Sequence, residues 1–372
     1  MQRAHKIRLY PTKEQEVQLS KTAGTSRYAY NWALAEWKKG YEEFSNGRSS
    51  VKPSALKLSA RWTQERPEWA EEVNRGSQTK AIMNVGIAFQ NLWRGIEKHP
   101  RFLKKGRKDS FYVDNAHACI CDRQINLPKI GKVKLAEPLR YTGKILSYTV
   151  SHYAGQWHVS VQVELPDAEH PCTNPTSVVG IDVGLKHIAV ASDGSVLDAP
   201  ESLKRLEVHL RNKQRALARS QRNSSNHQKL LLRKQKVQNR INNIRLDVTH
   251  KFTTSIAKNH GIVVAEDLDL KGMMKKAEYR SMRRSLGHSM MGLVLQQLAY
   301  KAKELKKVDR FFPSTKTCSC CGAKKDYIDL SERTYVCSEC GAVVDRDMNA
   351  AINLMKAGAV SAGVPVDLAA SC

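Results

Sequence analysis

The sequence lacks the features of a membrane or secreted protein. It contains no apolar run of about 18 residues, which a membrane-spanning helix needs, and no secretory signal peptide. Acidic residues are also scarce, since 36 Asp and Glu stand against 61 Lys and Arg, for a formal net charge of +25. We therefore expect a soluble, cytoplasmic protein with a polyanionic partner, either nucleic acid or a membrane surface. The 372 residues are enough for two or three domains.

The nine cysteines do not have the distribution of a disulfide framework. Four of them form two Cys-x-x-Cys pairs separated by fifteen residues, and a glycine that permits a tight turn follows each pair. The four are Cys318, Cys321, Cys337 and Cys340. This spacing is typical of a zinc ribbon, and four thiolates leave no open position for water, so the predicted zinc is structural. Cys320 is out of register and is predicted to be a spare.

One carboxylate lies near the end of an apolar stretch. Residues 178–183 form a β-branched run that predicts a buried strand, and this run carries Asp182 between Gly180 and Gly184. A lone carboxylate is costly to bury unless a metal or another cation compensates it. By itself, Asp182 could equally be an ordinary hydrogen-bonded residue at a strand end.

Two further acidic stretches favour a metal-binding role for Asp182. A second apolar run from Gly261 ends in Glu266 and Asp267. Asp345 and Asp347 open a helical pattern near the C-terminus. Acids at two strand ends and one helix start can converge on Mg²⁺, and two such ions roughly 4 Å apart can clamp the oxygens of a phosphodiester. The set indicates metal-dependent phosphoryl transfer on an RNase H-like α/β core.

The N-terminal region is predicted to begin with a strand and continue as helices. Residues 6–10 alternate basic and apolar, and Thr12 can cap the next helix together with Gln15. Residues 13–39 have mixed helical spacing that is interrupted at 23–25. This segment is either a helix-turn-helix that reads a groove or part of a plain helical bundle.

Residues 54–97 are predicted to be helical as well. Their large apolar residues are expected in the core, and the aromatic ones are expected there rather than as platforms for stacked bases. These residues are Trp62, Trp69, Ile82, Val85, Ile87, Phe89, Leu92 and Trp93.

Four short β-runs follow, with a tight turn at Ala154-Gly155. They cover 125–127, 131–135, 145–153 and 156–165. Their spacing predicts a small barrel or sandwich that recruits the N-terminal strand. Farther on, residues 289–307 are predicted to form one helical segment, and the chain beyond 357 is predicted to be loosely ordered.

Two basic segments are candidates for nucleic-acid contacts. The first is a loop at 101–111 with interleaved aromatics, and the second covers 203–258 as two helices joined near 223–226. Each could be merely a solvated surface, but their length and single sign of charge favour a phosphate backbone. The candidate contact residues are Arg101, Lys104, Lys105, Arg107, Arg215, Arg219, Arg222 and Arg245.

Together these motifs resemble the TnpB family, which consists of insertion-sequence proteins related to type V CRISPR effectors. The resemblance is carried by Gly-Ile-Asp-Val-Gly at 180–184, Val-Ala-Glu-Asp-Leu at 264–268, the ribbon from 314 and Asp-Arg-Asp-Met-Asn-Ala-Ala at 345–351. Weaker matches lie at 100–104 and 243–251. The order of these motifs holds over nearly the whole chain.

This resemblance implies an RNA-guided DNA endonuclease encoded by a transposon, with a RuvC-type, RNase H-like nuclease domain. It implies that Asp182, Glu266 and Asp347 are catalytic and hold two Mg²⁺ ions, with Asp345 behind them or facing phosphate. It also implies a guide RNA from the transposon end and a double-stranded DNA target next to a short adjacent motif. The alternatives are a nuclease-dead RNA-guided repressor and a transposase that joins DNA strands.

The resemblance also implies a domain order. A β-barrel wedge domain would comprise 1–10 and 100–170, and a helical recognition domain would comprise 11–99. The RuvC-like domain would comprise 176–312 and 344–358, interrupted by a zinc ribbon at 313–343 that binds target nucleic acid. Residues 359–372 would form a flexible tail.

Overall fold

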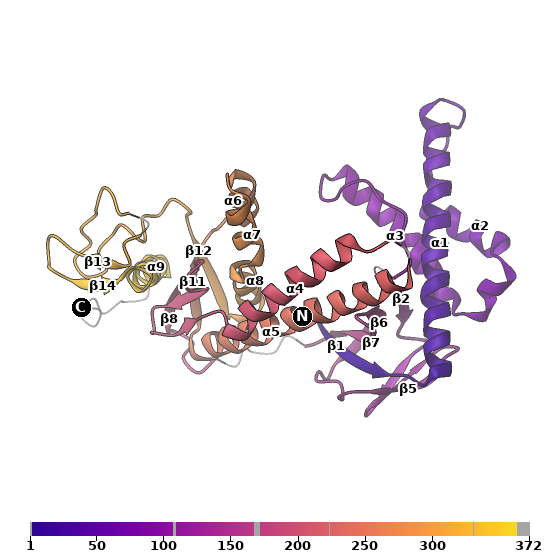
Figure 1. The fold of residues 1–372 in the computed structure, drawn as a ribbon, viewed down its shortest axis with the longest axis horizontal. Helices are drawn as coiled ribbons and strands as arrows, with labels where there is room; N and C mark the ends of the chain where they lie inside the picture. The colour runs from indigo at the N-terminus through magenta and orange to yellow at the C-terminus, as the bar shows by residue number, and fades with distance from the viewer. Residues whose placement is uncertain (1, 107–108, 167–171, 223, 330, 363–372) are drawn as a thin grey trace. The chain divides into compact units, whose positions relative to one another are not determined.

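A computed structural model describes residues 2–106, 109–166, 172–222, 224–329 and 331–362. The chain divides into two compact units, with the boundary between residues 168 and 169 (Figure 1). We call them the N-terminal unit and the C-terminal unit and describe each by itself.

The N-terminal unit contains a seven-stranded antiparallel sheet with the order β2-β6-β7-β1-β5-β4-β3. Its strands are β1 (Gln2–Tyr10), β2 (Asp109–Asp114), β3 (Cys119–Cys121), β4 (Gln124–Leu127), β5 (Gly131–Leu135), β6 (Lys144–Tyr153) and β7 (Gln156–Glu164). The N-terminal strand joins this sheet between β7 and β5, as the sequence predicts. Among the described strands β2 and β3 end the order, so a closed barrel stays a prediction.

The turn between β6 and β7 has the local conformation that its sequence requires. Ala154 and Gly155 have φ values of 55° and 76°. Two successive positive φ angles are typical of the tight hairpin turn that matches the twist of the flanking strands. The turn therefore fixes the register of the long β6–β7 ladder, which pairs Tyr153 with Gln156.

The helices of the N-terminal unit are α1 (Lys13–Ser45), α2 (Ala55–Glu65), the short 3₁₀ helix η1 (Glu68–Glu72) and α3 (Arg75–Trp93). The predicted cap of α1 is confirmed, because Thr12 Oγ1 accepts the Gln15 N–H at 3.3 Å and Gln15 Oε1 accepts the Thr12 N–H at 3.1 Å. The helix continues through Gly24 without a turn, so this segment is one long helix of a bundle (Figure 1).

The predicted core of these helices is only partly correct. Trp62 and Phe89 are buried, together with Ile82 and Val85. By contrast, Trp69, Ile87 and Trp93 expose 47%, 47% and 58% of their surface. Only one face of α3 packs into the cluster shared with α1 and α2, and the apolar residues on its other faces stay at the surface.

The C-terminal unit contains a five-stranded mixed sheet with the order β10-β9-β8-β11-β12. The strands are β8 (Val178–Asp182), β9 (Ala189–Ala191), β10 (Val196–Leu197), β11 (Ile262–Glu266) and β12 (Glu304–Val308), of which β8, β11 and β12 run parallel. The prediction of one helix over 289–307 is wrong at its end. Residues from Glu304 pair with β11, and the lysines of this edge strand obscure its apolar alternation in the sequence.

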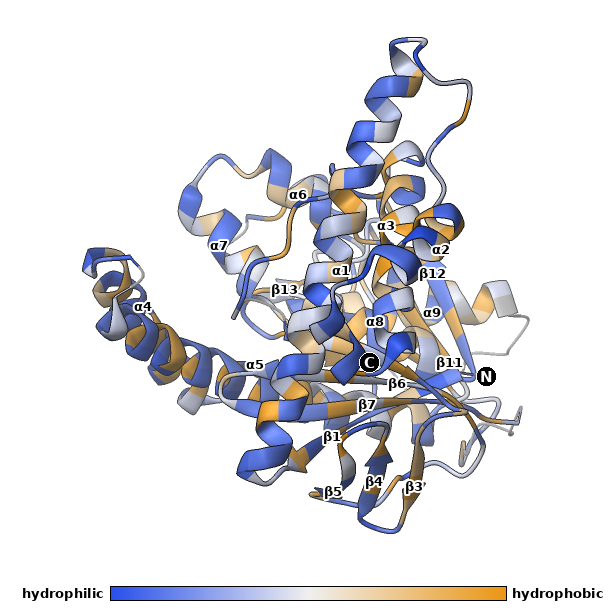
Figure 2. Ribbon diagram, turned by 90° about the vertical axis from the view of Figure 1, so that its right-hand side faces the viewer, coloured by the Kyte–Doolittle hydropathy of each residue, from blue (hydrophilic) through white to orange (hydrophobic). Residues whose placement is uncertain are grey.

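The helices of this unit are α4 (Glu201–Arg219), α5 (Ser225–Asn259), α6 (Leu270–Lys276), α7 (Arg280–His288), α8 (Met291–Lys301) and α9 (Arg346–Ala362). Helices α5 and α8 pack on one face of the sheet, and α9 packs on the other. The predicted pair of basic helices is confirmed as α4 and α5, and Ser224 caps α5 by accepting the His227 N–H at 3.1 Å. Hydrophilic and hydrophobic segments alternate along both helices (Figure 2). No helix in the described ranges is long and apolar enough to cross a membrane.

The chain enters α9 directly from a small hairpin formed by β13 (Thr334–Val336) and β14 (Val343–Asp345). The helix continues to Ala362, and Ala359 is fully buried. The expectation of a loose tail from 357 is therefore wrong for the described part of that segment. The rest of the predicted tail, 363–372, lies outside the described residues.

Candidate nuclease site and metal centre

The face of the sheet toward which Glu266 points follows from the alternation along β11. Val263 belongs to the core formed with α5 and α8, whereas Ile262 and Val264 pack against Leu354 of α9. Successive side chains of a strand point to opposite faces. Glu266 is therefore on the α9 face of the sheet, at the carboxyl end of the strand.

The same argument places Asp182. Ile181 of β8 packs into the core with α5 and α8, so Gly180 and Asp182 are on the α9 face. A Cβ on Gly180 would collide with the backbone of Ala351 and Met355 in α9. Only glycine permits this close approach, which seats the helix against β8 two residues before the acid.

The third acid lies in the first turn of α9. Asp345 Oδ1 accepts the N–H of Asp347 at 2.9 Å and that of Met348 at 3.1 Å, so Asp345 caps the helix. The hydrogen bonds thus distinguish the roles of Asp345 and Asp347, which the sequence alone leaves open. Asp345 is engaged with the backbone, while the Asp347 carboxylate has the Arg346 Nε 3.7 Å away.

The charges of the three predicted acids act on one another. Burial and the neighbouring carboxylates of Asp347 and Glu266 together raise the pKa of Asp182 to about 7, against the opposing effect of Arg346. Burial also raises the pKa of Glu266. Such a cluster favours a compensating divalent cation, and carboxylate oxygens are the ligands that Mg²⁺ prefers. The donor set therefore fits the predicted ion.

Asp267 lies beside this cluster in sequence but not in space. Its carboxylate is ion-paired with Lys307 Nζ at 2.8 Å and with the Arg310 guanidinium at 3.4 Å. The hydrogen bond from Lys307 lowers the pKa of Asp267. The prediction that Asp267 points away from Glu266 agrees with these partners.

The four ribbon cysteines form a compact cluster, with all four sulfur atoms within 4.8 Å of one another. Cys318 Sγ lies 3.7 Å from Cys340 Sγ, and Cys321 Sγ lies 3.6 Å from Cys337 Sγ. A tetrahedral site with Zn–S bonds of about 2.3 Å requires sulfur separations of about 3.8 Å. The cluster therefore fits the predicted structural zinc.

Two matching knuckles shape this cluster. The N–H of Gly322 donates to the carbonyl of Cys318 at 3.0 Å, and the N–H of Gly341 donates to Cys337 at 3.1 Å. Both glycines have positive φ, of 78° and 72°, a conformation that favours glycine. The N–H of Cys340 helps to lower the pKa of Cys337, which favours the metal-binding thiolate there, whereas hydrogen bonds with the neighbouring cysteines raise the pKa of Cys321.

Most of the predicted nucleic-acid contacts are at the surface. Arg101, Lys104 and Lys105 are exposed in a loop that is held to α1 by Asn31, whose side chain bonds both backbone groups of Leu103 at 2.8 and 3.0 Å. In the C-terminal unit, the exposed predicted residues are Arg215, Arg219 and Arg222. Arg107 lies outside the described residues.

Arg245 does not suit the predicted contact. Its guanidinium donates to Glu207 Oε1 at 2.6 Å, and only 17% of the side chain is exposed. A second partner is His288 Nδ1 at 3.2 Å. The charge is thus compensated inside the fold, where it joins α4, α5 and α7.

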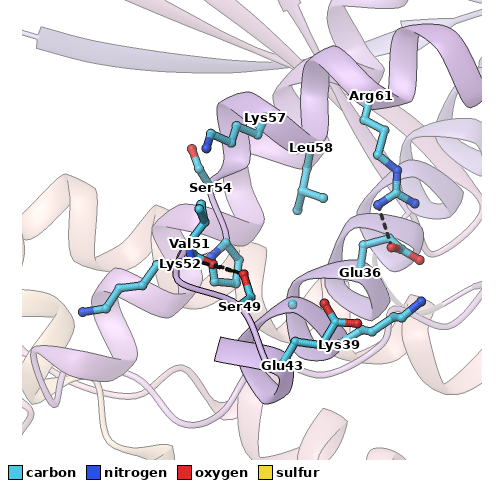
Figure 3. Close-up of a pocket in the computed structure, with 12 residues that line it drawn as sticks. Glu36, Lys39, Glu43, Ser49, Val51, Lys52, Ser54, Lys57, Leu58 and Arg61 are labelled. Atoms are coloured by element: carbon cyan, nitrogen blue, oxygen red, sulfur yellow. Dashed lines mark hydrogen bonds and ion pairs between the residues drawn. The ribbon is translucent and has the colours of Figure 1, made fainter. Parts of the chain in front are cut away.

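The N-terminal unit also has a pocket of about 280 Å³ between α1 and α2 (Figure 3). Lys39 and Lys57 line it, but so do Glu36 and Glu43. The close-up shows the Arg61 guanidinium directed at the Glu36 carboxylate, 2.8 Å away. Because the lining carries both signs of charge, it indicates no single class of ligand.

An α/β sheet with acids at its strand ends and a four-cysteine ribbon is typical of the metal-dependent nuclease class. Three family models match the chain. They are described as "Probable transposase" of the OrfB/IS605 type over residues 158–277, a helix-turn-helix domain over 1–46, and a Cas12f1-like TNB domain over 292–354. The chain belongs to the TnpB family, which is related to the Cas12 effectors.

Relatives match over nearly the whole length. A Streptomyces pristinaespiralis protein named "Putative RNA-guided DNA endonuclease" is 31% identical, over 96% of this chain and 90% of the relative. The Escherichia coli K12 protein of the same name, InsQ, is 29% identical over 95% and 92%. Among solved structures, Cas12f1 in a complex with sgRNA and target DNA shares the fold, with a TM-score of 0.55, 14% identity and coverage of 95% and 98%.

Proposed function

We propose that this chain is an RNA-guided DNA endonuclease that cleaves target DNA by metal-dependent phosphodiester hydrolysis at Asp182, Glu266 and Asp347. The observation that carries this proposal is that the carboxylates of Glu266 on β11 and Asp347 on α9 act on Asp182 at the end of β8 and, with burial, raise its pKa to about 7. Family membership supports the reaction class, because the two relatives described above are named for it.

Each acid would have a distinct part. The three carboxylates would hold Mg²⁺, whose chemistry when bound is to activate a water molecule and to stabilise the leaving 3′ oxygen. Asp182 is the most central of the three, since both other acids act on its pKa, and it would be the principal carboxylate ligand of the metal. Glu266 and Asp347 would supply the remaining carboxylate ligands. Asp345 would hold the first turn of α9 in place through its cap.

The remaining parts of the proposal concern partners. The guide RNA would come from the transposon end, and the target would be double-stranded DNA next to a short adjacent motif. Arg215, Arg219 and Arg222 would face the phosphates of the guide–target duplex, whose sequence is read by base pairing. The four cysteines would hold one structural zinc ion.

The other functions considered have less support. A nuclease-dead repressor would have no need for three half-buried acids whose charges act on one another, and the chain carries all three. A strand-joining transposase could use a similar acidic set, but the names of the relatives favour the guided nuclease.

The test is DNA cleavage by the protein copurified with RNA expressed from its own locus. Asp182→Ala is expected to abolish cleavage in Mg²⁺ while leaving RNA and target binding unchanged. Asp267→Ala is the matched control, because this acid is adjacent to Glu266 in sequence and pairs with Lys307 instead. Cleavage by Asp182→Ala at the wild-type rate would contradict the proposal, as would heterogeneous RNA that modest salt displaces.

A further inference from the structure

The amide of Asn349 joins α9 to the first zinc-binding knuckle. Its Oδ1 accepts the backbone N–H of Ser319 at 2.8 Å, and its Nδ2 donates to the carbonyl of Thr317 at 2.8 Å. These two residues flank the zinc ligand Cys318. The Asn349 side chain is fully buried, so both of its polar ends are satisfied by the knuckle alone.

Two more residues on the same face of α9 extend this contact. Asn353 Nδ2 donates to Ser314 at 2.8 Å and to Thr317 at 2.6 Å, and Asn353 is 5% exposed. Lys356 Nζ donates to the carbonyl of Ser319. The spacing of four and three residues places all three side chains along one side of the helix.

The β13–β14 hairpin holds the same helix at its N-terminal end. β14 runs into α9 without a linker, and the N–H of Arg346 donates to the Arg333 carbonyl at 2.8 Å. Asp347 is the next residue. The backbone that carries this acid is therefore fixed by the ribbon on both sides, through Arg346 before it and Asn349 after it.

We propose that Asn349 is a positioning residue for Asp347 and that it makes cation binding at the acid site depend on the folded, zinc-loaded ribbon. This inference rests on the proposed function only in taking Asp347 as a metal ligand. Asn349 faces the knuckle through its two hydrogen bonds. Asp347 points to the other side of the helix, because residues two apart on a helix point roughly 200° apart. Asn349 acts on the metal by fixing the helix turn from which Asp347 extends.

An ordinary structural contact would give a different result. If Asn349 only attached the ribbon, its loss would lower stability or zinc content and leave the acid site unchanged. If it positions Asp347, its loss weakens cation binding even in protein that still holds zinc. Removing groups that orient metal ligands typically costs 10- to 100-fold in affinity.

The experiment measures Mn²⁺ binding to the full, RNA-free chain by calorimetry, with zinc content determined on the same samples. Mn²⁺ serves as the probe because it favours the same oxygen ligands as Mg²⁺. We expect Asn349→Ala to keep zinc near one per chain and to bind Mn²⁺ roughly 10- to 100-fold more weakly. The matched control is Ser361→Ala on α9, whose hydroxyl donates to Gly358 within the helix.

A second variant covers the case in which Asn349→Ala does not fold. Asn353→Ala leaves both bonds of Asn349 in place and is expected to weaken Mn²⁺ binding by a smaller factor. Wild-type affinity in every zinc-loaded variant would overturn the inference.

Zinc dependence is tested by combining Asn349→Ala with Cys337→Ser, which removes a predicted zinc ligand. If the amide transmits the effect, Cys337→Ser alone weakens Mn²⁺ binding, and adding Asn349→Ala weakens it little more. Fully additive losses would overturn the coupling. Asp182→Ala separates this outcome from the proposed function: if it leaves Mn²⁺ binding unchanged, the acid cluster is not the metal site at all.

Discussion

The backbone of Gly180 in β8 lies directly against the Ala351 carbonyl in α9, with no room for a Cβ between them. This contact brings a strand and a helix that are far apart in the sequence close enough for their acids to act on one another. The glycine two residues before Asp182 is thus part of the architecture of the acid site.

Gly180→Ala is predicted to destabilise the C-terminal unit and to weaken metal binding. The added methyl group meets the backbone of Ala351 and Met355, which cannot move aside as a flexible side chain can. Overpacking of this kind costs about 1–3 kcal/mol. The measurement is thermal unfolding of the full chain with and without Mg²⁺.

The control for the added methyl group is Gly24→Ala in α1. There the new Cβ meets only the end of the Arg27 side chain, at 3.8 Å, and alanine favours a helix. We expect Gly24→Ala to leave the unfolding temperature unchanged or to raise it. A Gly180→Ala variant as stable as wild type would contradict the packing described here.

A second prediction concerns the pH dependence of stability without divalent cations. The pKa of Asp182 is raised from 3.8 to about 7, so the folded state holds this proton more tightly than the unfolded state. Folding therefore loses stability from this group as the pH rises from 3.8 to about 7. At about 1.4 kcal/mol per pKa unit, the loss is at most about 4 kcal/mol.

Asp182→Asn should remove this penalty. In the absence of metal, the variant is expected to unfold at a higher temperature than wild type at pH 8 and at a similar temperature at pH 4. Mg²⁺ should stabilise wild type and not the variant. Equal stability of the two proteins at pH 8 in a chelating buffer would argue against the raised pKa.

A third prediction concerns the ribbon. Cys337→Ser is expected to lower zinc content and to increase protease sensitivity near residues 314–345, because ribbons of this type fold on metal binding. The control is Cys172→Ser, a half-buried free cysteine outside the four-cysteine cluster. Zinc near one per chain in Cys337→Ser would remove Cys337 from the ligand set.

The interacting acids and the four-cysteine cluster could be predicted from the sequence because short-range patterns determine them. Asp182 and Glu266 end apolar runs whose alternation fixes their faces, and two cysteine pairs at ribbon spacing carry their own geometry. The roles of Asp345 and Asp347 could not be distinguished from the sequence, because either acid could be the cap at the start of the helix. Which of them is the cap depends on where the backbone enters the helix.

Other features depend on tertiary packing that no local pattern carries. The strand at Glu304 exists because β11 offers an edge, and its lysines obscure its alternation. Trp93 is apolar and helical yet exposed, since only one face of α3 meets its neighbours. Asn349 belongs to the recognisable acidic motif, but its contact with the zinc knuckle appears only when the two segments are folded together.

The last prediction concerns the basic helices. Arg215→Gln and Arg219→Gln, made together, are expected to weaken RNA binding with little effect on stability, because both residues are exposed on α4. Each lost phosphate contact should reduce the slope of log affinity against log salt by about one. The measurement is a salt titration of binding to the copurified RNA.

Arg245→Gln is the contrasting variant: it breaks the 2.6 Å bond to Glu207 and should lower the unfolding temperature while leaving the salt slope unchanged. An unchanged slope in the double variant would place the RNA elsewhere on the protein.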